Sequence, residues 1–343
     1  SFSLILVPEV VSSQKIQYVL EEGADFGAIL DLREADGILD GMVTPQICCG
    51  SDCQEGSPFA LSVGIGPVKQ VVQLMFQDSY VAALSRFGLQ GAQIKVQDQM
   101  VWVINEIYQG INVEIRTQAV TDYALYSIVE VHGFDPNNLG LMGYDNTVGK
   151  DVGNLRLYDT LGGVNSHTQQ DGYPGYGGVF LESYFGFSEN PPEGISSIDL
   201  ASGLFDLIFD PLRPDRGGTP VSAAEVSGIT PVEDLTVCLS SPKSRSMEVA
   251  CAVTVIANLV GSTIAHELGH SFGLAEPGSQ DIFHNLGDRS FRLMDSGGSR
   301  PFEERTGLSG QGIEMFCISN YQYLRSIMPD PAHSEDGLQR PGC

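Results

Sequence analysis

The clearest hydrophobic patterns lie in the middle of the chain. Residues 68–76 are rich in β-branched and other apolar residues and are predicted to form a strand. Residues 93–109 repeat apolar positions with the 3.6-residue period of an amphipathic helix. Gly110 ends this predicted helix, and residues 111–115 follow at once as another strand. The pattern therefore predicts a β-α-β unit, which favours a right-handed crossover between parallel strands.

Further strands are predicted over residues 124–131, 154–158 and 178–185. Residues 132–177 are rich in glycine, asparagine and aspartate, and residues 186–245 are rich in proline and glycine. Both compositions predict long surface loops. Loops of the first kind often hold calcium, so Ca2+ is a candidate ion there. The residues Asp135, Asn137 and Asn138 do not, however, match the EF-hand spacing.

The N-terminal part of the chain has a different pattern. Short apolar runs at residues 2–7, 15–20 and 28–32 alternate with glycine-bearing turns such as Ala35-Asp36-Gly37. We therefore predict two domains, a small β-rich module over residues 1–64 and a larger domain over residues 65–343. The module contains nothing catalytic, and its role could be targeting or that of a retained pro-segment.

A long buried helix is predicted towards the C-terminal end. Residues 250–264 are hydrophobic on nearly all sides, as in a helix surrounded by protein. Ser246 is the predicted N-cap, and Glu248 lies in the first turn, where the helix dipole favours an anion. Gly273 can adopt the left-handed conformation that turns the chain after a helix.

Composition restricts the class of protein. The 343 residues are 42% hydrophobic and 18% charged, as in ordinary globular proteins, and we expect no membrane span. The first residues lack a basic leader, so we expect a mature or trimmed start. The net charge of −25 argues against nucleic-acid binding, which needs a positive surface. This acidity suits a secreted, extracellular protein with a well-solvated surface.

Seven cysteines strengthen the extracellular interpretation. In an oxidising compartment they would form up to three disulfides and leave one thiol. Cys48, Cys49 and Cys53 are typical of a disulfide cluster on a Gly/Ser-rich loop, because no second paired motif follows to complete a zinc knuckle.

The strongest chemical signal is His266-Glu267-Leu268-Gly269-His270 at the end of the predicted buried helix. Two histidines four residues apart lie on one helix face and can bind one metal ion together. Glu267 is placed to act as general base on a metal-bound water. This is the H-E-x-x-H arrangement of zinc hydrolases, and it makes zinc (Zn2+) the predicted cofactor.

Two further features narrow the motif. Gly273-Leu274 follows at the x-x-G position, and Leu293-Met294-Asp295-Ser296-Gly297 is similar to a Met-turn. Together these residues resemble the metzincin metalloproteases. The resemblance covers roughly residues 65–343, although only about thirty residues carry specific motifs. It implies an α/β catalytic domain with a twisted, mixed five-stranded sheet, a backing helix and a buried active-site helix.

The activity implied by the resemblance is zinc-dependent endopeptidase cleavage of protein or peptide substrates. Glu267 would be the general base, and Met294 would pack beneath the zinc without taking part in chemistry. In metzincins an antiparallel edge strand binds the extended substrate, and residues 178–185 are the candidate here by chain order. Substrate preference and oligomeric state are not readable from the sequence.

The third zinc ligand is open between two residues. The family spacing places Glu276 where a histidine or aspartate is usual, and glutamate can bind zinc. His284 would need an eight-residue insertion, of a kind known in leishmanolysin-like metzincins. Imidazole is the commonest metal ligand, and His284 stands ten residues before Met294, close to the spacing in several metzincins. Both points favour His284.

Other interpretations are weaker. The family's tyrosine after the Met-turn is replaced by Ser296, so no tyrosine helper is expected there. In a gluzincin-type peptidase the third ligand would be a later glutamate, such as Glu303 or Glu304. A non-catalytic binding or adhesion protein on a protease-like scaffold would not need Glu267. The remaining histidines are expected to be surface or loop residues, namely His132, His167 and His333.

Overall fold

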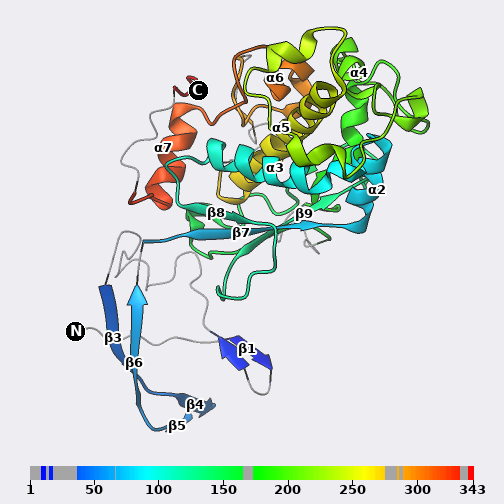
Figure 1. Cartoon of the computed structure of the whole chain (residues 1–343). Helices are drawn as coiled ribbons and strands as arrows, with labels where there is room; N and C mark the ends of the chain where they lie inside the picture. The colour runs from blue at the N-terminus through cyan, green and yellow to red at the C-terminus, as the bar shows by residue number, and fades with distance from the viewer. Residues whose placement is uncertain are drawn as a thin grey trace.

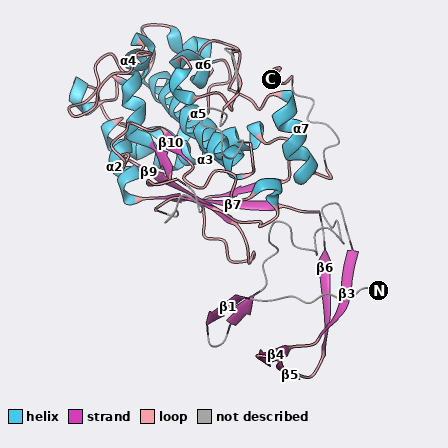
Figure 2. Ribbon diagram, turned by 180° about the vertical axis from the view of Figure 1, so that it is seen from behind, coloured by secondary structure: helices cyan, strands magenta, loops and turns pink. Residues whose placement is uncertain are grey.

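The computed structural model describes residues 9–12, 15–17, 37–65, 67–164, 173–274, 284–285, 289–332 and 339–343. A mixed sheet lies beneath a layer of helices, and small β-hairpins form the N-terminal part (Figure 1). Seen from behind, the helices again gather on one side of the sheet (Figure 2). The predicted α/β class is therefore confirmed.

The sheet follows a five-strand path, with one short strand beside it. Its order is β10 (Gly143–Tyr144), β12 (Gly178–Phe180), β9 (Ser127–His132), β7 (Gln70–Phe76) and β8 (Val113–Arg116). The short β11 (Thr160–Leu161) pairs with β9 next to β12. Only β10 runs antiparallel to its neighbour, so the expected mixed sheet is confirmed.

Two helices connect β7 to the parallel strand β8, as the β-α-β pattern predicts. They are α2 (Asp78–Arg86) and α3 (Gln93–Ile107). The remaining helices are α4 (Gly203–Phe209), α5 (Arg245–Ser271), α6 (Phe302–Thr306) and α7 (Ile318–Ile327). Short 3-10 turns connect them, at Gln90–Ala92, Val152–Asn154, Leu181–Phe187, Pro214–Arg216, Glu225–Gly228, Leu235–Leu239 and Gly297–Ser299.

The long helix α5 forms the centre of the core. From Val249 to Ser271 every residue is buried, because apolar side chains cover all sides of the helix. Gly261 lets α3 approach closely, since a Cβ at this position would lie 2.9 Å from Cβ of Val103. By length and composition α5 could cross a membrane, but its apolar window is wholly buried inside the protein.

Helix α5 begins two residues earlier than the predicted N-cap implies. The N-cap is Ser244, not Ser246, because Ser244 has extended backbone angles and its Oγ accepts the amide hydrogen of Met247 at 3.4 Å. Ser246 lies inside the first turn. Two serines in alternate positions carry the same capping signal, so the sequence did not distinguish them.

Two predicted strands differ in the structure. Residues 154–158 are not a strand, because Asn154 and Leu157 have positive φ angles of 51° and 59°. The strand lies just beyond, in β11. Residues 178–185 form a strand only as far as Phe180, after which the chain continues as a 3-10 helix. The region 186–245 also contains α4, so it is not loop throughout.

The described N-terminal residues form hairpins. They are β1 (Glu9–Ser12) with β2 (Lys15–Gln17), β3 (Gly37–Val43) with β6 (Phe59–Ile65), and β4 (Gln46–Cys49) with β5 (Asp52–Glu55). The predicted strands at residues 2–7 and 28–32 lie outside the described residues. The domain boundary at residue 64 stays a prediction.

Three disulfides join Cys48 to Cys53, Cys238 to Cys251 and Cys317 to Cys343. Cys49 is exposed and carries the remaining thiol. The expected three disulfides with one cysteine left over are therefore confirmed. Disulfides of this number indicate an oxidising environment.

Candidate metal centre

The C-terminal end of α5 brings two imidazoles together. His266 and His270 are both buried, and their ring centroids lie 4.5 Å apart, as the four-residue helical spacing requires. Nδ1 of His266 lies 2.6 Å from the carbonyl oxygen of Leu293, and Nδ1 of His270 lies 3.2 Å from that of Leu274. A carbonyl can only accept, so both Nδ1 atoms donate and each Nε2 is the nitrogen suited to a metal.

A third imidazole joins them from the loop after α5. The ring of His284 lies 5.3 Å from the rings of His266 and His270. One nitrogen from each histidine lies within 4.8 Å of the others, so the group could hold a metal ion. The backbone amide of Asn285 donates to the carbonyl of Met294 at 2.9 Å and ties the loop to the turn beneath. Glu276 lies outside the described residues.

Gly273 turns the chain sharply after the helix. Its φ of 102° is unfavourable for any residue with a side chain, and a Cβ there would lie 2.7 Å from the hydroxyl of Tyr323. That hydroxyl in turn donates to the carbonyl of Phe272 at 2.7 Å. The turn proposed for this glycine from the sequence is therefore present.

Met294 packs beneath the histidines. It is buried, and its Sδ lies 2.8 Å from the position of a Cβ on Gly269, between the two α5 histidines. The preceding residue, Leu293, supplies the carbonyl that orients His266. The same turn therefore packs Met294 under the helix and orients the ring of His266. Ser296, in this turn, lines the cavity.

The environment keeps the imidazoles neutral. Burial lowers the pKa of His266 well below its ordinary value, and the neighbouring His270 and His284 lower it further. Burial also lowers the pKa of His270 to about 3 and that of His284 to a lesser extent. Neutral imidazole is the form that binds metals, and three such donors with one open position suit Zn²⁺. The donor set therefore fits the predicted ion.

Glu267 lies beside the three histidines and is only 6% exposed. Burial raises its pKa to about 8, against the opposite effects of the Asp145 amide and the Arg305 charge. Gly143 of β10 covers the carboxylate so closely that a Cβ there would lie 2.9 Å from Cδ of Glu267. Sequence reasoning missed Gly143, because only the folded sheet brings it over the helix.

A cavity of about 450 Å³ opens above these residues. The three histidines and Glu267 line it, and β10 forms one wall. Arg305 and Glu314 are also lining residues, both deeply buried. Arg305 donates to Oγ1 of Thr263 at 2.7 Å, one helical turn before Glu267. No sequence motif marks Arg305, so its place at the site was not foreseen.

The prediction that residues 178–185 form an edge strand is wrong. We expected residues 178–185 at the sheet edge, but β12 lies between β10 and β9. The edge strand beside the cavity is β10, which precedes β12 in the sequence but lies outside it in the sheet. Chain order cannot reveal this, because strand order depends on long-range pairing.

The glutamates of the gluzincin alternative are engaged elsewhere. Glu303 accepts from Oγ of Ser202 at 2.7 Å, and Glu304 accepts from the guanidinium of Arg300 at 2.7 Å. Neither belongs to the histidine group.

The other candidate residues are also accounted for where the structure describes them. His132 is not a surface residue as expected, since it is buried in β9 and lies 2.9 Å from the carboxylate of Glu130. The aromatic rings of Tyr176 and Phe180 lie against its imidazole, at centroid distances of 5.1 and 5.9 Å. Asp135 accepts the backbone amides of Asn137, Leu139 and Leu141, so its carboxylate organises the loop. His167 and His333 lie outside the described residues.

The arrangement combines a buried three-histidine group with an adjacent carboxylate and an open cavity. Such a set can hold a metal ion and move a proton beside it. No family model, curated protein or solved structure among those compared with this chain matches it.

Proposed function

We propose that this protein is a secreted, zinc-dependent endopeptidase with a metzincin-like active site. The observation that carries the proposal is the convergence of His266, His270 and His284 beside Glu267, at the floor of one cavity. In this proposal the three histidines are the metal ligands, with His284 rather than Glu276 as the third. The Met-turn resemblance and the position of Met294 under Gly269 support it.

The residues around the site supply the protein's part of the chemistry. When bound, a zinc ion lowers the pKa of a water molecule and polarises a substrate carbonyl. Glu267 takes a proton from the attacking water and delivers it to the leaving amine. Burial raises the pKa of Glu267 to about 8, and the Asp145 amide, the charge of Arg305 and, when bound, the charge of the zinc ion act in the opposite direction, towards the ionised carboxylate that this role requires.

We assign peptide binding to the edge strand β10. One side of β10 pairs with β12, through Gly143 opposite Val179 and Tyr144 opposite Gly178. Among the described residues no strand pairs with its other side. An extended peptide can add to such an edge by main-chain hydrogen bonds. Its scissile bond would then pass over Glu267, because Gly143 lies directly above that carboxylate.

The decisive test compares Glu267→Gln with Glu248→Gln, a control at the other end of α5. We expect Glu267→Gln to keep its zinc content and fold but to lose at least about 100-fold in peptide-library cleavage. Glu248→Gln should cleave normally, and a chelator should abolish cleavage until zinc is restored. Zinc binding without cleavage by the wild type would favour the non-catalytic binding protein. Substantial cleavage by Glu267→Gln would exclude the general-base role.

A further inference from the structure

A second cavity lies on another part of α5. Its volume is about 720 Å³, within the usual range for ligand sites, and it shares no lining residue with the catalytic cavity. Helix α3 contributes Gln99, Trp102 and Glu106, whose spacing places them on one helix face. Helix α5 contributes Thr254 and Asn258, one turn apart.

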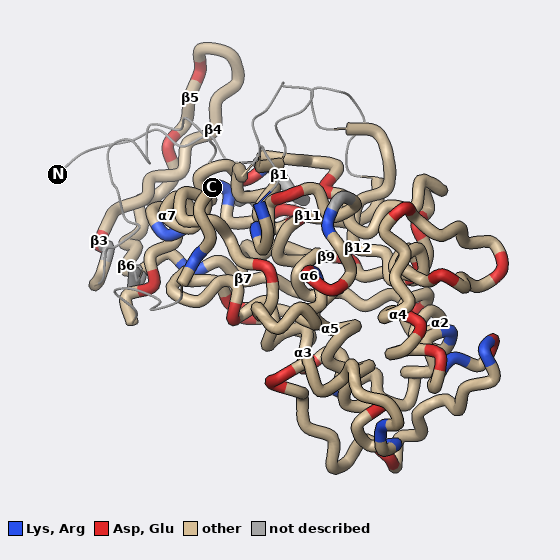
Figure 3. Tube along the Cα trace, turned by 90° about the horizontal axis from the view of Figure 1, so that it is seen from above, with Lys and Arg blue, Asp and Glu red and all other residues tan. Residues whose placement is uncertain are grey.

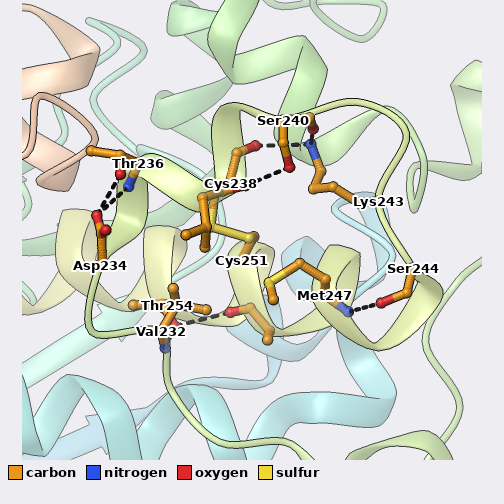
Figure 4. Close-up of a disulfide and its surroundings, with 12 residues drawn as sticks. Val232, Asp234, Thr236, Cys238, Ser240, Lys243, Ser244, Met247, Cys251 and Thr254 are labelled. Carbon is orange, nitrogen blue, oxygen red and sulfur yellow. Dashed lines mark hydrogen bonds between the residues drawn. A yellow bond between two sulfur atoms is a disulfide. The ribbon is translucent and has the colours of Figure 1, made fainter.

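The opposite wall is fixed to α5 rather than loosely attached. The backbone amide of Val232 donates to Oγ1 of Thr254 at 3.1 Å, and the disulfide between Cys238 and Cys251 anchors the following turn (Figure 4). Asp234 accepts the amide of Thr236 at 3.0 Å and caps that turn. The cavity therefore has a preformed wall.

The lining of this cavity is acidic and rich in hydrogen-bond acceptors. Glu106, Glu233 and Asp234 line it, and among the residues that the structure describes no lysine or arginine does. Asn258 is only 2% exposed, and its Nδ2 donates to the carbonyl of Thr306 at 2.7 Å, but its Oδ1 has no partner. A buried acceptor without a donor is unfavourable, so the site calls for a ligand or water that donates.

Trp102 adds an aromatic surface to these acceptors. It is the single tryptophan of the chain and is 50% exposed at the cavity. Indole attracts cations through its ring face, and a guanidinium can stack on it while donating to carboxylates. The excess of acidic positions along the whole trace favours the approach of a cation (Figure 3).

We propose that this second cavity binds a guanidinium group, as carried by an arginine side chain. The planar cation stacks on Trp102, pairs with Glu106 and Glu233, and donates to Oδ1 of Asn258. An ammonium group could pair with the carboxylates but lacks the planar face for stacking. The proposal concerns binding alone and holds whether or not the first cavity is catalytic.

Trp102 also provides the test, because all tryptophan fluorescence of the protein reports on this cavity. The full chain is titrated with N-acetyl-arginine amide and with N-acetyl-citrulline amide, which has nearly the same shape but no charge. We expect a saturable fluorescence change for the arginine compound, with a Kd on the order of 1 mM, and at least about tenfold weaker binding of citrulline. N-acetyl-lysine amide should also bind more weakly.

Matched variants locate the effect. Glu106→Gln and Glu233→Gln should each weaken binding of the arginine compound about tenfold, the loss expected for one charge-assisted contact. Glu248→Gln removes an equal charge from α5 outside the cavity and should leave the Kd unchanged. Equal binding of citrulline, equal binding of lysine, or unchanged affinity in both cavity variants would overturn the assignment. So would the absence of any saturable change.

Discussion

Gly143 leaves no room for a side chain beside Glu267 at the proposed active site, and Gly143→Ala tests this arrangement directly. A Cβ at residue 143 would lie 2.9 Å from Cδ of Glu267 and 2.7 Å from Cγ2 of Thr263, and closer still to Oε1 of Glu267. Ordinary contacts of a Cβ begin near 3.4 Å. Thr263 and Glu267 belong to the same buried helix, so the β10 backbone must shift away from Thr263 and the Glu267 carboxylate must rotate.

The structure gives the size of the expected effect. Restoring normal contact displaces the carboxylate oxygen by roughly 1 Å. A displacement of that size at a reacting group costs about 100-fold in rate, or about 2.7 kcal/mol of activation free energy. We therefore expect kcat/KM of Gly143→Ala to fall about 100-fold, while zinc content is unchanged because the three histidines do not move.

The assay is hydrolysis of a fluorogenic peptide, with zinc stoichiometry and thermal unfolding measured on the same samples. Gly228→Ala is the matched control, because no atom lies within 4 Å of a Cβ at that position. It should match the wild type in all three measurements. If Gly143→Ala folds, binds zinc and keeps kcat/KM within about threefold of the wild type, Glu267 does not act from the position under β10.

Three other changes are informative. His284→Ala should lose bound zinc while Glu276→Ala retains it; the reverse result would identify Glu276 as the third ligand. Replacing Cys238 and Cys251 by serine opens a loop of sequence separation 13 and should lower the free energy of unfolding by about 3 kcal/mol in urea titrations, so an unchanged midpoint would contradict the structural role. Burial raises the pKa of Asp151 to about 8, so the folded protein holds a proton that the unfolded chain releases above about pH 4. This group's stabilising contribution is complete below pH 4 and declines towards pH 8; Asp151→Asn should flatten the fall in Tm over that window, and parallel curves would refute the shift.

The sequence predicts local structure well where side-chain periodicity decides it. The 3.6-residue pattern over residues 93–109 identifies α3, and the apolar run before His266 identifies α5 as buried. The H-E-x-x-H spacing predicts two neighbouring imidazoles because helix geometry alone fixes their distance. These features need no knowledge of the rest of the chain.

Long-range pairing is what the sequence could not provide. The edge position of β10 depends on which strands meet, and a strand of two residues carries no pattern of its own. The approach of Gly143 to Glu267 follows from that pairing. Positive φ angles at Asn154 and Leu157 likewise accompany tertiary contacts, such as the side-chain amide of Gln70 that donates to the carbonyl of Leu157 at 3.3 Å. Local propensity favoured a strand there and was overridden.

One pattern in α5 connects the two cavities. Polar residues recur every fourth position along this largely apolar helix, at Thr254, Asn258, Ser262, His266 and His270. Four residues slightly exceed one turn, so the row winds slowly around the helix over about 24 Å. The first two residues line the second cavity, and the last three line the cavity of the histidine group.

Burying polar groups along a core helix is costly unless each finds a partner or a ligand. The Nδ1 atoms of His266 and His270 find backbone carbonyls, and both rings turn towards His284. The Nδ2 group of Asn258 has a partner, but its Oδ1 has none, and the residue lines the cavity that Trp102 also lines. An apolar residue would pack there without this cost. The reasoning that makes the three histidines candidate metal ligands therefore also makes the Asn258 end of the row a candidate place for a donor ligand.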